Sequence, residues 1–424
     1  MMMESARQQF QLIRDRKISP EELVKIHLDR IAEINPALNA VVAPVPVTTG
    51  GVPFSVKDSI EVAGTRCTAG VLGRRDAPPS TEDASLVKML RGAGAVPIAK
   101  TNLPDMLFSF ESDNLIFGRT NNPYDLTRTS GGSSGGEAAL IAACGSPWGL
   151  GSDAAGSVRV PAAFCGIASL KPTSGCLPRE GHFPPAGGWI EALWQIGPMA
   201  RYVEDLRLMM EIFGAPHRPF GKPRIAFYTE GADAEVTRVV HDAAKALEQH
   251  AVSIMEDRPP CLDVVYDLEM KLIGPDGGDA LRGLAAALGS TRVHPLLTGW
   301  LDKLEAYRTD LAGFQGYWAE WDLYRAEMRA FLQRYDAILC PAYIHPALPH
   351  GASIDDENFR GFRQTMAFNV SGWPAGVVRC GTSAAGLPIA VQVAAGPWQE
   401  DLVLTILGWL EEAMGGWQPT SLEL

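Results

Sequence analysis

The sequence predicts an α/β protein with a single large mixed, mainly parallel β-sheet covered by helices on both faces. Short apolar runs typical of strands alternate along the chain with segments whose apolar residues recur at helical spacing. Apolar residues make up 46% and charged residues 20% of the 424 residues, which allows a large core. We find no internal repeat and no clear linker, and therefore expect residues 1–424 to form one domain.

The N-terminal elements are expected to be two helices and three strands. Ser19 is a suitable N-cap, Pro20 fits the first turn, and Glu22 can complete a capping box. Apolar residues at helical spacing follow, so a helix is expected to begin here. Strands are expected at 40–42, 52–62 and 94–99, a second helix at 83–90, and a loop at 100–104.

A polar, glycine-rich loop at 119–136 then leads into an alanine-rich helix at 137–144. The pattern at 222–255 is strand, helix, strand. Residues 260–330 are rich in Leu, Ala, Trp and charges, and are expected to be a variable helical insertion in the domain. Strands at 336–340, 375–379 and 389–393 follow, and a helix at 401–414 ends the pattern, with Gly415 at its C′ position.

The composition also limits the class of function. A formal charge of −12 argues against nucleic-acid binding, which leaves a basic footprint. No segment resembles a signal peptide or a membrane span. Seven dispersed cysteines without CxxC pairs, and eight scattered histidines, predict a cytoplasmic protein with free thiols and neither a metal nor another cofactor. The sequence leaves a homodimer open.

The least ordinary segment is the glycine–serine stretch at 130–136, which has three interpretations. A flexible linker is disfavoured because the stretch lies inside core-forming sequence. A phosphate-binding loop is disfavoured because Glu137, not lysine, follows the last glycine. Ser133 lies in a bare G-x-S-x-G pattern, but no hydrophobic strand precedes it, and the available partners His345 and His350 have no distinguishing context.

A longer pattern resolves this segment. From Gly131 to Ala162 the chain reads GGSSGGEAALIAACGSPWGLGSDAAGSVRVPA, which closely resembles the amidase-signature family at every constrained position. The chain is nearest in motif to fatty-acid-amide hydrolase-like and bacterial amidases. Further segments similar to the family lie at 52–58, 99–104, 197–201, 368–375 and 386–388. The resemblance implies the amidase-signature fold and a hydrolase of C–N bonds other than peptide bonds.

The resemblance assigns roles residue by residue. Ser157 occupies the nucleophile position, Ser133 that of a bridging serine after a cis peptide bond, and Lys57 that of the lysine completing a Ser–Ser–Lys triad. The implied oxyanion hole consists of the backbone amides of Ala154, Ala155, Gly156 and Ser157. Asp153 and Arg159, which flank this segment, are expected to pair and hold the loop.

Two departures from the family pattern accompany these roles. Many members have Gly-Gly before the nucleophile, where this chain has Ala155-Gly156. The segment between residues 42 and 52 is also shorter than in typical members. Neither change involves the three reacting groups.

The residue types suit the implied chemistry. A serine hydroxyl becomes a good nucleophile when a neighbouring base takes its proton. Lys57 can be that base only when neutral, and burial favours the neutral form. Ser133 can relay the proton because a hydroxyl both donates and accepts. A lysine in a strand usually lies on the surface, so this assignment depends on all three family contexts occurring together.

Aromatic and aliphatic residues predict an apolar or aryl substrate, with plain core packing as the open alternative. The candidate substrate-binding residues are Leu107, Phe108, Phe110, Trp189 and Trp194, of which the first three are implied by the resemblance, since they lie in the region that lines the acyl pocket in fatty-acid-amide hydrolase-like members. We expect amide hydrolysis through a Ser157 acyl-enzyme, with aryl esters, anilides and carbamates (urethanes) cleaved through a similar oxyanion. The alternative is a glutamine amidotransferase A-type subunit that supplies ammonia in a complex, although its further glutamine-recognition pattern is not evident.

Overall fold

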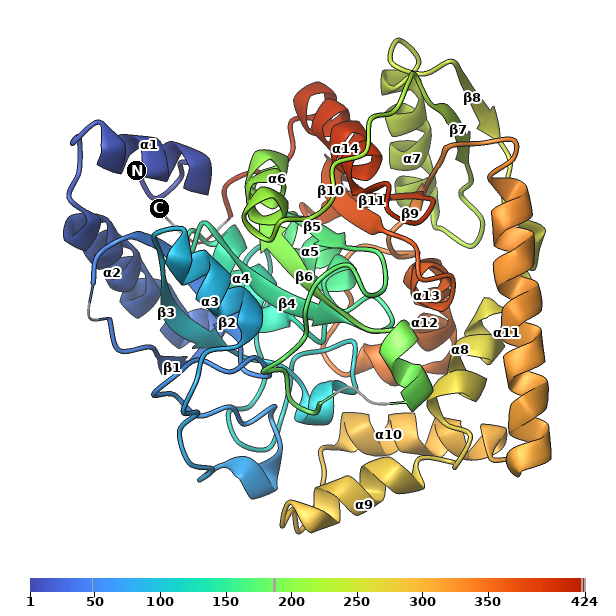
Figure 1. Ribbon diagram of the computed structural model, residues 1–424, viewed down its shortest axis with the longest axis horizontal. Helices are drawn as coiled ribbons and strands as arrows, with labels where there is room; N and C mark the ends of the chain where they lie inside the picture. The colour runs from blue at the N-terminus through green and yellow to red at the C-terminus, as the bar shows by residue number, and fades with distance from the viewer. Residues whose placement is uncertain (48, 186–187, 421, 423–424) are drawn as a thin grey trace.

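The computed structural model describes residues 1–47, 49–185, 188–420 and 422, the side chains of residues 188 and 189 excepted. The strands are β1 Val41–Pro44, β2 Val52–Lys57, β3 Ala95–Thr101, β4 Trp148–Asp153, β5 Ala168–Lys171, β6 Gln195–Ala200, β7 Arg224–Phe227, β8 Ser253–Glu256, β9 Ala337–Pro341, β10 Ala375–Thr382 and β11 Pro388–Ala395. Within the described residues they form one eleven-stranded sheet in the order β1-β3-β2-β4-β6-β5-β10-β11-β9-β7-β8 (Figure 1).

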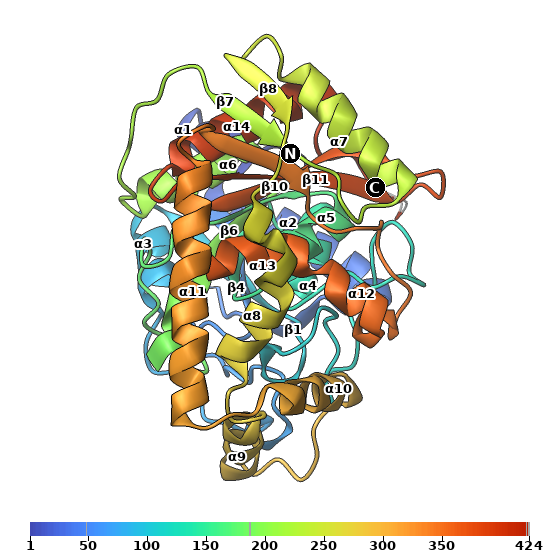
Figure 2. The same cartoon turned by 90° about the vertical axis from the view of Figure 1, so that its right-hand side faces the viewer.

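Helices cover both faces of this sheet (Figures 1 and 2). Those in the N-terminal half are α1 Ala6–Arg14, α2 Pro20–Leu38, α3 Ser85–Gly92, α4 Gly135–Ala142, α5 Arg159–Cys165 and α6 Val203–Ile212. Those in the C-terminal half are α7 Ala234–Ala246, α8 Val265–Ile273, α9 Asp279–Ala287, α10 Pro295–Leu304, α11 Leu311–Phe331, α12 Asp356–Gly361, α13 Arg363–Val370 and α14 Glu400–Met414. The α/β class and the large mixed sheet are therefore confirmed.

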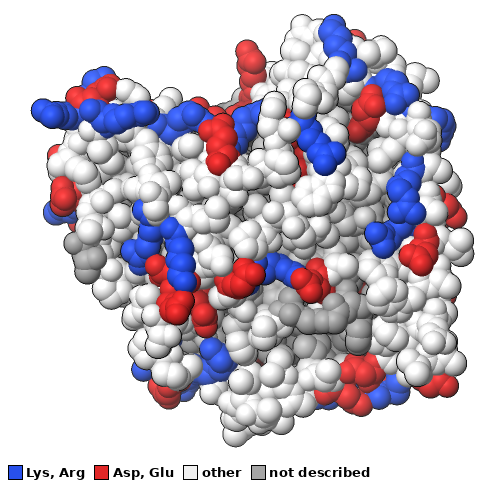
Figure 3. All heavy atoms as spheres, viewed as in Figure 1, with Lys and Arg blue, Asp and Glu red and all other residues white. Residues whose placement is uncertain are grey.

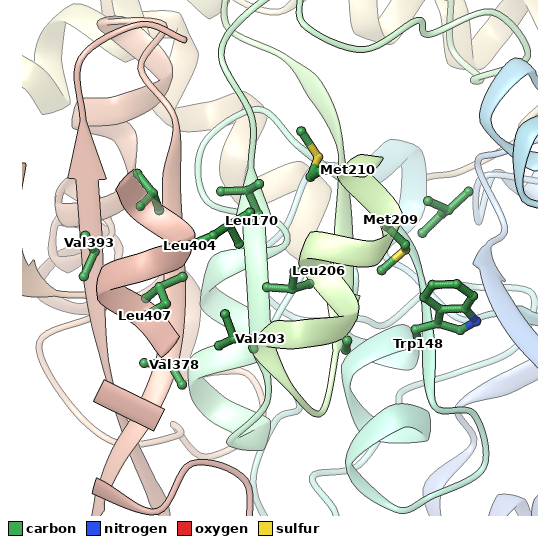
Figure 4. Close-up of a cluster of buried hydrophobic side chains, with 14 of the residues drawn as sticks. Trp148, Leu170, Val203, Leu206, Met209, Met210, Val378, Val393, Leu404 and Leu407 are labelled. Carbon is green, nitrogen blue, oxygen red and sulfur yellow. The ribbon is translucent and has the colours of Figure 1, made fainter. Parts of the chain in front are cut away.

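The core lies in layers on the two faces of the sheet. Ala337 and Leu339 of β9 belong to the cluster under α6, α7 and α14, whereas Ile338 and Cys340 belong to the cluster on the opposite side. This alternation is the period of two that a strand imposes. Figure 4 shows the first layer, with side chains of α6 and α14 packed over the central strands, for example Leu206 near Leu170 of β5.

The expectation that parallel pairs dominate is wrong. Among the described strands, parallel pairing joins β2 to β3 and β4, and β7 to β8 and β9, whereas the other six neighbouring pairs are antiparallel. Parallel neighbours need a crossover of a dozen or more residues. Strands β10 and β11 are separated only by residues 383–387, and their register places Thr382 opposite Pro388, so they form a hairpin.

Three central strands, β4, β5 and β6, lie where no strand is predicted. They are short and contain residues that are depleted in strands, such as Gly149 and Pro198. The structure explains Gly149, because a Cβ atom there would lie 2.6 Å from the Ser55 carbonyl oxygen on the neighbouring strand. Lys100 and Thr101, expected in a loop, instead end β3.

The helical character of residues 260–330 is confirmed by α8, α9, α10 and α11, while the prediction that they form an insertion in a single domain stays a prediction. These helices flank the sheet on the side shown in Figure 2. In the described part of the chain, we find no helix with the length and apolar character that crossing a bilayer requires.

Charged side chains of both signs are interspersed on the face shown in Figure 3. Some charged residues lie in the interior instead of on the surface, although Lys, Glu, Asp and Arg rarely do so unless they are paired. Lys57, Glu137, Asp153 and Arg159 are each 0% exposed. All four come from β2, β4, α4 or the N-terminus of α5, so they converge on one region of the sheet.

Candidate functional site

Lys57 ends β2 and points into the protein interior. Its Nζ lies 2.7 Å from Ser133 Oγ and 3.1 Å from Ser152 Oγ. Every position of β2 is buried, so the usual surface placement of a strand lysine does not apply here. Burial lowers the pKa of Lys57 well below 10.5, although Asp153 and Glu137 act in the opposite direction.

Glu137, on α4, has its own partners. Ser55 Oγ donates to one carboxyl oxygen, and Thr101 Oγ1 donates to the other at 2.6 Å. Burial nevertheless raises the pKa of Glu137 to about 8, so the group is mainly protonated at neutral pH. A neutral Glu137 does little to favour a charged Lys57.

Asp153 and Arg159 form a buried ion pair with an Nη2–Oδ1 distance of 2.9 Å, as expected from the sequence. Burial by itself would raise the pKa of Asp153, but the Arg159 guanidinium and the Asn369 amide hold it below its usual range. Asp153 also accepts the amide N–H groups of Gly156 at 2.8 Å and Val158 at 3.1 Å. The pair therefore fixes the loop that contains Ser157.

The glycine–serine loop is an ordered, buried segment that leads into α4. The peptide bond between Gly132 and Ser133 is cis, as the resemblance implies. Ser112 Oγ donates to the Gly131 carbonyl at 3.0 Å and accepts the Gly135 N–H at 2.9 Å. A Cβ atom at Gly132 would lie 2.6 Å from the Glu111 nitrogen, so this close approach requires glycine.

The loop between β4 and α5 presents Ser157 beside this segment. The Ser157 carbonyl accepts the Ser134 N–H at 3.1 Å, which ties the two serine loops together. Within the described part of the chain, the amides of Ala154, Ala155 and Ser157 have no acceptor, whereas that of Gly156 donates to Asp153. Three of the four predicted oxyanion-hole donors are thus free to bind an anion.

Gly156 cannot be replaced without strain. Its φ is +124°, and a Cβ atom there would clash with Thr365 Oγ1 and lie 2.6 Å from Thr365 Cβ. Thr365 Oγ1 donates to the Ala155 carbonyl at 2.7 Å, so α13 supports this loop directly. Ala155, where many family members have glycine, is one of the residues that line the adjoining cavity.

A cavity of about 360 Å³ adjoins these groups and has Ser133, Ser152 and Ser157 in its wall. Leu107, Phe108 and Trp194 line it, as predicted for substrate contacts. Phe110 is not among the described lining residues. Its ring stacks on Phe362 at 3.6 Å and lies 5.2 Å from that of Trp300. The side chain of Trp189 lies outside the described residues.

One wall of this cavity is not predicted from the sequence. That wall comes from α8, α9 and α10 and includes Ile273, Ala280, Leu281, Leu284 and Trp300. The sequence contains only a weak signal for this wall. Ala280, Leu281 and Leu284 make only a narrow apolar stripe on a short helix bounded by glycines, and such a stripe is equally typical of a helix packed on a core.

The comparisons with known proteins agree with this fold. A family model described as Amidase matches residues 22–404, so the chain belongs to the amidase family, and the predicted resemblance is confirmed. Members of this family hydrolyse C–N bonds, and the protein is a hydrolase of this class.

Individual relatives extend over most of the chain. Fatty-acid amide hydrolase 2 of Homo sapiens is 30% identical, covering 97% of this chain and 89% of that protein. The A-type subunit of the glutamyl-tRNA(Gln) amidotransferase of Thermus thermophilus is 31% identical, covering 91% of this chain and 92% of its own. The solved structure of 6-aminohexanoate cyclic dimer hydrolase with substrate is 25% identical, with a TM-score of 0.88 and 99% of both chains covered.

Proposed function

We propose that the protein hydrolyses amides of apolar or aryl carboxylic acids through an acyl-enzyme on Ser157. The observation that carries the proposal is the 2.7 Å contact between the buried Lys57 Nζ and Ser133 Oγ, beside a cavity that Ser133 and Ser157 share. A neutral lysine held against a hydroxyl is a base joined to a proton relay.

In the proposed reaction, Ser157 Oγ attacks the carbonyl carbon while its proton passes to Ser133 and the proton of Ser133 passes to Lys57. The carbonyl oxygen becomes an oxyanion that the free amides of Ala154, Ala155 and Ser157 stabilise, at about 3–4 kcal/mol for one donor. The C–N bond then breaks, and the proton returns through Ser133 to the leaving amine. Water hydrolyses the Ser157 ester by the same relay. The contribution of the Gly156 amide to the oxyanion hole stays a prediction, because this amide donates to Asp153.

The composition of the cavity wall supports the substrate class. Apart from three serines, the described lining residues are hydrophobic, and none of them carries a charge. Such a wall favours an uncharged acyl or aryl group, because an unpaired charge would lose its hydration there. Aryl esters and carbamates share the tetrahedral oxyanion, so we propose that they are cleaved in the same site.

The similarity to part of a glutamyl-tRNA(Gln) amidotransferase keeps a glutaminase as the second candidate. Free glutamine carries an ammonium and a carboxylate, and both need charged or strongly polar partners when buried. The described cavity wall has no charged side chain, and its hydroxyl groups belong to Ser133, Ser152 and Ser157, two of which the proposed reaction uses. Measuring ammonia release from glutamine against hydrolysis of a simple aryl amide by the purified protein distinguishes the two candidates, since a strict requirement for glutamine and partner subunits would exclude the proposal.

Labelling with a fluorophosphonate tests the nucleophile. We expect the adduct on Ser157 by peptide mass spectrometry, no labelling of Ser157→Ala, and labelling that is reduced at least 100-fold in Lys57→Ala because the base is lost. Ser146→Ala is the matched control, since its Oγ donates to the Trp148 carbonyl at 2.7 Å away from the described cavity wall. An adduct on Ser133 would instead support the G-x-S-x-G interpretation, and full-rate labelling of Lys57→Ala would remove lysine from the mechanism.

A further inference from the structure

Asn369, on α13, is a buried amide that the catalytic proposal does not use. It is 0% exposed, and its side chain contacts three separate elements of the site. Its Oδ1 accepts from Arg159 Nη2 at 2.5 Å, and its Nδ2 lies 2.9 Å from Asp153 Oδ1. The same Nδ2 donates to the Leu193 carbonyl at 2.9 Å.

The first two contacts complete the support of the nucleophile loop. Arg159 has five N–H donors, and all five have acceptors, which lie on Asp153 (two), Thr365, Gln392 and Asn369. Asp153 in turn accepts the amides of Gly156 and Val158. Removing the Asn369 amide would leave one buried Arg159 N–H without an acceptor, which costs more than an average hydrogen bond, and would take away one of the three donors to Asp153 Oδ1.

The third contact reaches the wall of the cavity. Leu193 is 1% exposed and is one of the residues that line the cavity. Its backbone carbonyl accepts the hydrogen bond from Asn369 Nδ2. A group that fills the cavity therefore contacts Leu193, and the backbone carbonyl of Leu193 is bound by Asn369. One side chain thus joins the wall that contacts the acyl group to the ion pair that sets the oxyanion donors.

We infer that Asn369 is a positioning residue that couples filling of the acyl cavity at Leu193 to alignment of the Ser157 loop. This inference rests on the proposed function. Its consequence is that a large acyl group raises kcat and does not only lower KM. The reason is that the binding energy of its contact with Leu193 is realised in the transition state. A small acyl group that does not reach Leu193 cannot use the connection.

The role requires an amide at this position. Asparagine supplies a donor and an acceptor at once, which Asp153 and Arg159 need respectively. Aspartate would lose both donors and place a second carboxylate against Asp153. Leucine has a similar size but neither function. Asn369→Leu therefore removes the connection with little change in volume.

The test compares the anilides of acetic and octanoic acids in wild type, Asn369→Leu and Gln364→Leu. Gln364 is the matched control, because it is a buried amide on the same helix whose Nε2 donates to the Glu230 carbonyl at 2.8 Å, away from the loop. We expect the octanoyl-to-acetyl ratio of kcat to fall about tenfold in Asn369→Leu, with the ratio of KM unchanged, and to stay at the wild-type value in Gln364→Leu. An equal loss of kcat for both substrates would mean a merely structural role and would overturn the inference.

A second variant keeps the inference testable if Asn369→Leu does not fold. Leu193→Ala retains the backbone carbonyl and its bond to Asn369 but removes the side chain that meets the acyl group. We expect it to lower kcat for the octanoyl substrate about tenfold and to leave the acetyl substrate unchanged. An effect confined to KM would refute the coupling. Fluorophosphonate labelling of the wild type separates the two proposals, because an adduct on a serine other than Ser157 refutes the proposed function itself.

Discussion

Replacing Glu137 by glutamine tests the electrostatic basis of the site. Burial raises the pKa of this carboxyl from 4.5 to about 8, so the folded protein keeps a proton that the unfolded chain has already released over that range. The stability that Glu137 confers is therefore fully present below pH 4.5 and is lost as pH rises through about 8. Glutamine has a similar shape and cannot ionise.

The size of the effect follows from the two pKa values. Between about pH 4 and about pH 8, the unfolding free energy of the wild type should fall by about 4 kcal/mol relative to that of Glu137→Gln. Urea unfolding of both proteins across this range gives the difference. At about pH 7, where Glu137 is mainly protonated, kcat of Glu137→Gln should equal that of the wild type.

Glu411→Gln is the matched control for this experiment. Burial raises the pKa of Glu411 to about 7, and its carboxyl accepts the Val203 N–H at 3.0 Å. This variant should change the pH dependence of stability but not that of the rate. If the stabilities of wild type and Glu137→Gln run parallel from about pH 4 to about pH 8, Glu137 is not held protonated and the reasoning fails. Loss of activity in Glu137→Gln at neutral pH would show that the site needs the charged carboxylate.

Two further substitutions test the loop and the cavity. Gly156→Ala should slow acylation of the nucleophile at least 100-fold, because its Cβ would clash with the Thr365 side chain. Gly175 also has a positive φ, but no described atom outside its two chain neighbours lies within 4 Å of an added Cβ, so Gly175→Ala should cost about 1–2 kcal/mol of stability without slowing acylation. Leu284→Trp should lower kcat/KM for an octanoyl anilide about tenfold or more and spare the acetyl anilide, because it fills the cavity. Ala287→Trp, at an exposed position on the same helix, should change neither; an equal effect would place the acyl group elsewhere.

Local signals predict well those elements whose ends are fixed by their own residues. Ser19 accepts the Glu22 N–H at 3.1 Å with Pro20 in the first turn, as the sequence pattern indicates. The C-terminal helix ends at Met414 and is followed by Gly415 with a φ of +87°, again as expected. Ser133 and Ser157 could be named because one long pattern contains both, and Lys57 because a second family-like segment at 52–58 contains it. The structure places Lys57 against Ser133 and both serines at one cavity.

Features that depend on distant contacts could not be found in this way. The strand β4 contains Gly149 because α4 and β2 approach it closely, a condition that no local pattern reveals. The cavity wall from α9 and α10 depends on where these helices pack, and their own apolar spacing is equally typical of a core. Asn369 lies 216 residues from Asp153, and its role follows only from the bonds of its side chain to Asp153, Arg159 and Leu193.

The neutrality of Lys57 is best understood through the acids around it. Asp153 is paired with a buried arginine. Glu137 is held mainly protonated by burial. Asp58, the next residue in the chain, lies 3.3 Å from Lys100, and burial raises its pKa as well. Each nearby carboxyl group is thus either neutral or committed to another cation. Lys57 is left with the hydroxyls of Ser133 and Ser152 and the Ser152 carbonyl, which do not compensate a buried positive charge as a carboxylate would. Desolvation therefore decides its protonation state, and a lysine that elsewhere would be a charged surface residue has here the properties of a base.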